Sequence, residues 1–101
     1  MLRLQQLEKM LAAEPNDPLL NYSMAMELAK AERFDESLAR FRRVLELDGD
    51  YLAAYAQMGR LLLELGRRDE AKEALAEGVE RAGAKGERHA KDDMERILKA
   101  I

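Results

Sequence analysis

The chain has 101 residues, of which 37% are charged, and its formal net charge is −3. This length allows one compact domain or a short stack of repeats and excludes two independent hydrophobic cores. The mild charge provides no strong field toward nucleic acid or an anionic membrane, so we expect neither as a partner. Alanine, leucine, glutamate and arginine dominate and threonine is absent, which is typical of a wholly helical protein.

Short segments rich in glycine, proline and aspartate divide the chain into six predicted helices, between which apolar residues recur at helical spacing. Asp17 is placed to cap the second helix, whose first residue is Pro18. Asp35 and Asp69 are expected to cap the third and fifth helices, and Gly66 to end the fourth in a left-handed conformation. The predicted helices span residues 2–13, 18–31, 35–48, 51–65, 69–82 and 87–100.

The first predicted helix carries an apolar stripe that allows two interpretations. Its residues either pack onto the following helix, around Tyr22 and Leu28, or stay partly uncovered and mediate self-association. The stripe consists of Leu2, Leu4, Leu7 and Met10.

An internal repeat relates the middle of the chain to itself. Residues 21–49 can be laid over residues 55–83 without a gap, at an offset of 34 residues. A fixed period of this size indicates stacked supersecondary units that present a binding surface, and not one globule with a private active site. The identical pairs are Met24 and Met58, Leu28 and Leu62, Arg33 and Arg67, Asp35 and Asp69, Glu36 and Glu70, Glu46 and Glu80, and Gly49 and Gly83.

With these residues the chain resembles the tetratricopeptide repeat family, whose 34-residue unit is a helix–turn–helix with small residues where the two helices cross. Ala25 and Ser37 occupy the crossing positions of one repeat, and Gly59 and Ala71 those of the next, so the helices can approach closely. The resemblance implies an all-α, right-handed superhelical stack of antiparallel helix pairs with about six helices. Its expected parts are an N-terminal half-repeat (1–16), two repeats (18–51 and 52–85) and a capping helix (86–101).

Five residues depart from the family pattern. Asn21 and Arg68 stand where an aromatic residue is usual, Gly49 and Gly83 stand where proline is common, and Gly78 departs at position 27 of the second repeat. The last predicted helix has one apolar stripe and is charged over much of its remaining surface, which is typical of a cap that keeps a repeat stack soluble. The stripe consists of Ala90, Met94, Ile97, Leu98 and Ile101.

In family members the first helices of successive repeats line a concave groove that binds an extended peptide or a partner helix. The resemblance implies this role for Leu19, Tyr22 and Met26 of the first repeat and for Ala53, Ala56, Gln57 and Arg60 of the second. Tyrosine and arginine are typical anchors of interfaces, and methionine adapts to varied partners. The other interpretation is that Leu19, Tyr22 and Met26 are covered by a neighbouring helix of the same chain.

Other chemistry has little support in the sequence. The chain has one histidine, no cysteine and no glycine-rich phosphate loop, so we predict no catalytic residue, no metal and no cofactor. His89, Asp92 and Asp93 are interpreted as solvated charges on the last helix. The side chains Tyr22, Met26 and Gln57 do not match the residues with which chaperone-binding relatives clasp a carboxylate, so acidic chaperone tails are not expected to bind.

The predicted function is therefore non-catalytic protein–protein interaction, with a protein or peptide as partner. The alternative is a self-associating assembly unit that forms a weak homodimer through its terminal helices. The charged N-terminal segment does not resemble a signal peptide, and no apolar run approaches the roughly 20 residues that span a bilayer. These features predict a cytoplasmic protein.

Overall fold

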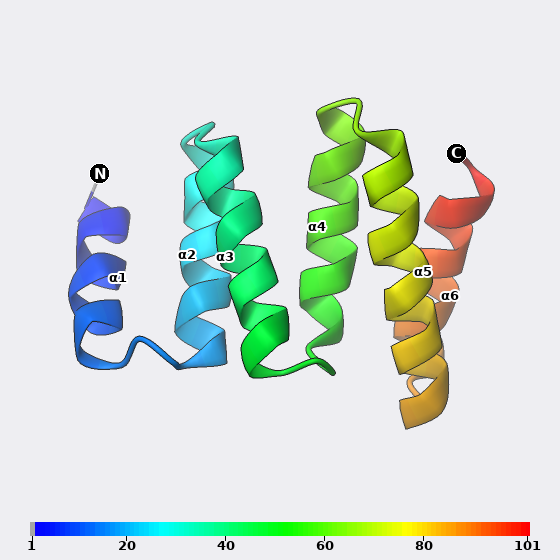
Figure 1. Cartoon of the computed structure of the whole chain (residues 1–101), viewed down its shortest axis with the longest axis horizontal. Coiled ribbons are helices and arrows are strands. Elements are labelled where there is room, and N and C mark those ends of the chain that lie inside the picture. Colours follow the sequence, from blue (N-terminus) through cyan, green and yellow to red (C-terminus); the bar gives the residue numbers. More distant parts are fainter. Residues whose placement is uncertain (1) are drawn as a thin grey trace. The chain divides into compact units, whose positions relative to one another are not determined.

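The computed structural model describes residues 2–101, apart from the side chain of Leu2. Met1, with which the predicted half-repeat begins, lies outside the described residues. No strand occurs within residues 2–101, so the predicted all-α class is confirmed (Figure 1). The six helices are α1 (Leu2–Ala13), α2 (Pro18–Lys30), α3 (Phe34–Leu47), α4 (Leu52–Glu64), α5 (Arg68–Lys85) and α6 (Arg88–Lys99).

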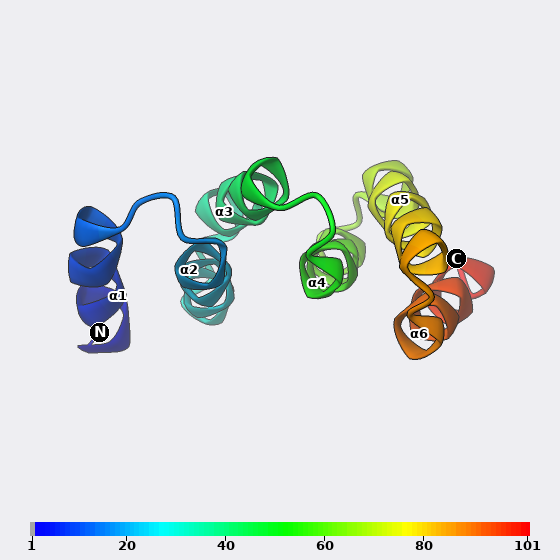
Figure 2. The same cartoon turned by 90° about the horizontal axis from the view of Figure 1, so that it is seen from below.

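The helices form two compact units, one that ends at Gly49 and one that spans Asp50–Ile101. The first unit contains α1, α2 and α3, and the second contains α4, α5 and α6. Within each unit every helix runs antiparallel to the one before it in the chain (Figure 1). In the view nearly along the helix axes, α2 lies beside α3 and α4 lies beside α5, which are the most extensively packed pairs (Figure 2).

The start of α2 follows the prediction. The side chain of Asp17 accepts a hydrogen bond from the Leu20 amide at 3.0 Å, and Pro18 occupies the first turn. This bond satisfies one of the amides that a helix N-terminus leaves without an intrahelical partner. The missing N–H of proline is no loss at this position.

The predicted caps of α3 and α5 are wrong by two residues. Both helices begin earlier, because the carbonyls of Arg33 and Arg67 already accept helical hydrogen bonds, from the amides of Ser37 and Ala71 respectively, each at 3.0 Å. The aspartates that were expected to cap lie instead in the first helical turn. There their charge complements the positive end of the helix dipole.

A left-handed residue ends α4 as predicted. Gly66 has φ of +76°, and the next amide, that of Arg67, donates to the carbonyl of Leu62 at 2.8 Å. The same turn occurs one repeat earlier, but there the left-handed residue is Glu32, with φ of +59°. In the first repeat Glu32, which has a side chain, therefore adopts a conformation that glycine adopts without steric cost.

The prediction that α5 ends at residue 82 is wrong, because the helix continues to Lys85. Gly83 adopts helical geometry, and the two residues after it, Ala84 and Lys85, favour a helix. The helix ends where Gly86 takes a left-handed φ of +73° and the amide of Glu87 donates to the carbonyl of Ala82 at 2.9 Å.

Small residues allow the helices of each pair to approach closely, as predicted. In the first unit the hydroxyl of Ser37 donates to the carbonyl of Ala25 at 2.7 Å, and both residues are fully buried. In the second unit an added Cβ at Gly59 would lie 2.6 Å from the side chain of Leu75. The backbones of α4 and α5 could not approach this closely if residue 59 had a side chain.

Gly78 has a structural reason for departing from the family pattern. An added Cβ at this position would lie 2.5 Å from the sulfur of Met94 on α6 and 2.7 Å from the Cβ of Tyr55 on α4. Both of these side chains are buried. The volume that a side chain at position 78 would fill is thus already occupied from two neighbouring helices.

The apolar stripe of α1 packs onto the first repeat. Leu4 and Leu7 are 5% and 1% exposed, so the interpretation of an uncovered patch is wrong for these two residues. Met10 is 50% exposed, and the side chain of Leu2 lies outside the described residues. The buried cluster consists of Leu4, Leu7, Leu11, Leu20, Met24 and Leu28, with Ala31 packed against it.

Candidate functional site

One side of α2 carries the predicted binding residues of the first repeat. Leu19, Tyr22 and Met26 are spaced by three and four residues, which places their side chains along one side of the helix. Leu19 is 60% exposed, and Tyr22 and Met26 are half-buried. This side of α2 therefore offers accessible apolar surface.

The ring of Tyr22 is supported by the core of the first unit. It meets the ring of Phe41 on α3 edge to face, with the centroids 5.9 Å apart and the planes at 66°. Phe41 is only 1% exposed, so its position is set by core packing. The contact restrains Tyr22 before any partner binds, and aromatic pairs of this geometry contribute about 0.5–1.5 kcal/mol beyond their buried area.

A buried asparagine fixes the start of the same helix. Asn21 has no exposed surface, and its amide nitrogen donates to the carbonyls of Pro15 at 3.1 Å and Asp17 at 2.8 Å. Its side-chain oxygen accepts a hydrogen bond from Arg40 of α3 at 2.8 Å. Asn21 thus joins the preceding loop, α2 and α3, a role that sequence reasoning missed. The only signal was a polar residue at a position where an aromatic residue is usual.

A second hydrogen bond holds the same loop to α3. Arg43 donates to the side chain of Asn16 at 2.8 Å, and its guanidinium also lies 3.4 Å from Glu46. The second unit repeats the arrangement with other residues, because Asp50, 34 residues after Asn16, receives Arg81 at 3.4 Å. In each unit an arginine of the second helix of a repeat therefore holds the loop that leads into the first helix.

The predicted binding residues of the second repeat have different chemistry. On α4, Ala53 and Arg60 are exposed, and Ala56 and Gln57 are half-buried. Within residues 2–101, the guanidinium of Arg60 forms no hydrogen bond or ion pair. At the 34-residue offset Ala53 corresponds to Leu19 and Arg60 to Met26. In the same way Ala56 corresponds to Tyr22 and Gln57 to Ser23. The large apolar side chains of α2 are therefore replaced on α4 by small, amide and cationic ones.

The same arginine–glutamate ion pair occurs in both repeats, away from the predicted binding residues. Arg33 donates to Glu36 at 2.6 and 2.8 Å, and Arg67 forms the equivalent pair with Glu70. The hydrogen bond from Arg33 lowers the pKa of the Glu36 carboxyl, and the bond with Glu36 raises the pKa of Arg33. In the second unit electrostatic attraction to the Tyr55 phenolate, followed by the hydrogen bond to Asp50, raises the pKa of Arg81. These shifts arise from surface pairing and do not mark a reactive group.

Surface hollows lie elsewhere in the first unit. One of about 530 Å³ is bounded by α1 residues alone, and another of about 250 Å³ lies among α1, α2 and α3. The second is lined by the buried Met24 and Leu28 and by charged side chains, among them the paired Arg33 and Glu36. Neither hollow includes a predicted binding residue.

Over residues 2–101, no three His, Cys, Asp or Glu side chains are grouped closely enough to hold a metal ion. His89, Asp92 and Asp93 are all exposed on α6. In the same part of the chain, no helix has the length and apolar character that crossing a membrane requires.

Comparison with known proteins agrees with this architecture. The family model described as tetratricopeptide repeat matches residues 28–91. The solution structure of a tetratricopeptide repeat domain protein from Salinibacter ruber is 30% identical, with coverage of 85% of this chain and 87% of that one and a TM-score of 0.80. Protein BPP2914 from Bordetella parapertussis is 28% identical, with coverage of 96% and 84% and a TM-score of 0.83. No curated protein matches the sequence.

The chain therefore belongs to the tetratricopeptide repeat family. Members of this family are generally protein–protein interaction modules and generally act as scaffolds without catalysis.

Proposed function

We propose that this protein binds a peptide or a helix of a partner protein through the accessible sides of α2 and α4. The binding residues are Leu19, Tyr22 and Met26 on α2 and Ala53, Ala56, Gln57 and Arg60 on α4. The protein acts without catalysis, metal or cofactor, and we place it in the cytoplasm.

The observation that carries this proposal is the exposure of Leu19, which is 60% accessible beside the half-buried Tyr22 and Met26. A large apolar side chain left in water at the start of a helix contributes nothing to the core. It gains free energy only when another molecule covers it, at about 25 cal/mol per Å² of apolar surface removed from water. The rigid support of Tyr22 by Phe41 reduces the conformational entropy that binding would cost.

The test replaces Tyr22 and Arg60 by alanine in one variant and compares capture of partners from a native lysate, followed by mass spectrometry. We expect partners held by the wild-type chain to be lost, because typical interface anchors contribute 2 kcal/mol or more each, about a thirtyfold change in affinity. Circular dichroism must show unchanged helicity in the same variant.

Met10→Ala is the matched control. It also removes an exposed apolar side chain, at 50% accessibility, but from α1 and not from the predicted binding residues. If the double variant and the control capture the same proteins as the wild type, the accessible sides of α2 and α4 are not the binding surface.

A further inference from the structure

One side chain of α6 is fully buried against the neighbouring helices. Met94 is 1% exposed and is the only residue of the helix that is fully buried. The rest of the apolar stripe, which consists of Ala90, Ile97, Leu98 and Ile101, is only half-buried. The attachment of α6 therefore depends strongly on where Met94 fits.

Met94 fits into a notch formed by Gly78 and Tyr55. The missing side chain of Gly78 creates the space, because its added Cβ would lie 2.5 Å from the Met94 sulfur and 2.7 Å from the Tyr55 Cβ. A notch shaped by the absence of one side chain accepts a matching side chain closely and others poorly. The α6 helix of a second copy carries the same methionine in the same apolar stripe.

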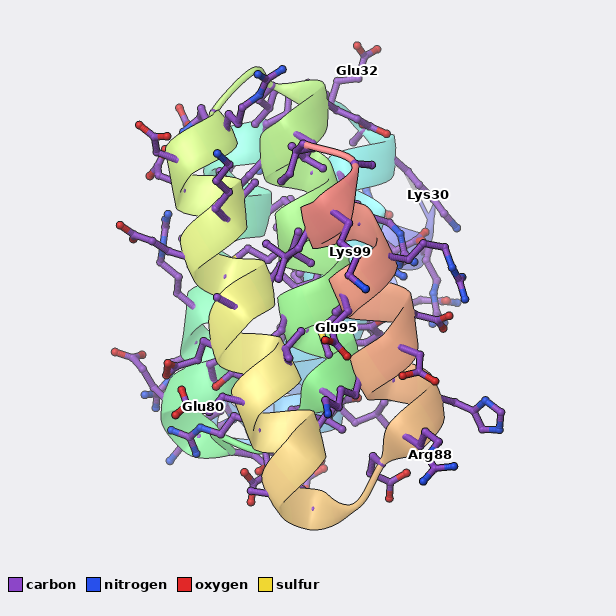
Figure 3. All side chains as sticks on the ribbon, turned by 90° about the vertical axis from the view of Figure 1, so that its right-hand side faces the viewer. Lys30, Glu32, Glu80, Arg88, Glu95 and Lys99 are labelled. Carbon is purple, nitrogen blue, oxygen red and sulfur yellow. The ribbon has the colours of Figure 1, made fainter. Side chains whose placement is uncertain are left out.

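The charged side chains of α6 contribute little to this attachment. Arg96 pairs with Asp93 of its own helix, at 3.3 Å, and Arg88, Asp92 and Lys99 are exposed. Arg88, Glu95 and Lys99 project from the ribbon of α6 in Figure 3. By contrast, hydrogen bonds from two arginines of α3 hold the start of α2. Separation of α6 would break apolar packing and, in the turn, the backbone hydrogen bond from Glu87 to Ala82.

The connection between α5 and α6 consists of two non-helical residues, Gly86 and Glu87. Gly86 has φ of +73°, and apart from its chain neighbours no residue lies within 4 Å of where its Cβ would be. Glu87, which precedes α6, provides no side-chain cap. Glu87 is also non-helical, with φ of −87° and ψ of 80°. If both Gly86 and Glu87 changed to right-handed helical geometry, α5 and α6 would join into one continuous helix and Met94 would leave its notch.

We propose that α6 exchanges between two copies of the chain, with Gly86 as the hinge. In the resulting dimer, the Met94 side chain of each copy occupies the notch of the other. The closed and exchanged forms bury the same apolar surface, so the hinge conformation and the protein concentration decide between them. This exchange gives the predicted self-association a route through α6, and it does not depend on peptide binding at α2 and α4.

The first test is Gly86→Ala, read by light scattering after size-exclusion chromatography over a range of concentrations. Alanine in the left-handed region disfavours the closed hinge about fivefold or more. Because a dimer contains two hinges, we expect its association constant to rise on the order of 25-fold or more.

Gly66→Ala is the matched control. Gly66 has φ of +76° and equally open surroundings, so the backbone strain is similar. Opening that turn would separate α4 from α5, and α4 contributes six buried residues. We therefore expect Gly66→Ala to lower the melting temperature while the protein stays monomeric.

A crosslink identifies exchange directly, since the chain has no cysteine. An added Cβ at Gly83 would lie 3.8 Å from the Lys91 side chain, so Gly83→Cys with Lys91→Cys places two thiols near each other across α5 and α6. A short bismaleimide should link them within one chain in the monomer and between chains in the dimer fraction of Gly86→Ala. Wild-type protein unfolded and refolded at high concentration is treated in parallel.

The proposal is overturned if neither sample yields dimers, or if the dimers that form contain only crosslinks within one chain. Loss of partner capture in the lysate experiment would leave it unaffected, because that experiment tests other residues.

Discussion

At the scale of single residues, the two repeats solve the same turn with different amino acids. Gly66 and Glu32 both adopt left-handed backbone conformations, and in each turn the following amide closes the turn by a hydrogen bond, from Arg67 at 2.8 Å and from Arg33 at 2.9 Å. Only glycine adopts this conformation without steric conflict between its side chain and the backbone. Glu32 therefore carries strain that tertiary packing of the first repeat overcomes.

Replacing Glu32 by glycine is expected to raise the free energy of unfolding by about 1 kcal/mol. The gain is the removed left-handed strain of about 1–2 kcal/mol, less the greater entropy of glycine in the unfolded chain. Urea denaturation followed by circular dichroism measures the change. Ala76→Gly, in the exposed middle of α5, should instead lower the free energy of unfolding by about 1 kcal/mol. A similar loss in both variants would contradict the assignment of backbone strain to Glu32.

At the scale of the helices, glycines inside α5 have opposite roles. Gly78 creates the notch that receives Met94, whereas Gly83 is exposed and an added Cβ there would meet only the Lys91 side chain, at 3.8 Å or more. The sequence pattern does not separate these two cases, because both glycines lie in the same helical stretch. Packing of α4 and α6 against α5 makes the difference.

Alanine at the two glycines should therefore have effects of opposite sign. Gly78→Ala is expected to destabilise by about 1–3 kcal/mol, because its Cβ overlaps Met94 and the Cβ of Tyr55, and the latter cannot rotate away. Gly83→Ala should stabilise by up to about 1 kcal/mol through helix propensity. Thermal unfolding of the two variants and of the wild type measures both changes in stability. A stabilised Gly78→Ala would show that the notch is not tight.

At the scale of the whole chain, the period of 34 residues, the all-α class and nearly all helix bounds could be predicted from the sequence. Every predicted bound lies within one residue of the structure except the end of α5. These features depend on local signals, such as the cap at Asp17 and the left-handed Gly66. The packing of α1 could not be predicted, because the same apolar stripe is compatible with a buried and an exposed helix.

The burial of α1 leads to a prediction about the stability of two variants. Leu7→Lys should lower the free energy of unfolding by at least about 3 kcal/mol, since it removes a 1% exposed side chain from the leucine cluster and places a charge there. Met10→Lys, at a half-exposed position on the same helix, should change it by less than about 0.5 kcal/mol. Chemical denaturation measures both. If the two variants were equally stable, α1 would not belong to the core of the first unit.

One part of the candidate site could be predicted from the sequence and another could not. The resemblance to tetratricopeptide repeats named Tyr22 and Arg60 from their positions in the 34-residue period, and their roles remain predictions. The buried network of Asn21 had no sequence pattern of its own, because its partners Pro15 and Arg40 come from a loop and from another helix.

Alone, the amino-acid sequence determined the repeat, the helices and the family, since each depends on residues that are close in the chain or repeat at a fixed offset. Tertiary structure decided which apolar stripe is covered, why Gly78 has no side chain and how Asn21 is satisfied. Those outcomes depend on which side chains of different helices share the same space. Local pattern carries no information on that, because a buried and an exposed position can have the same neighbours in sequence.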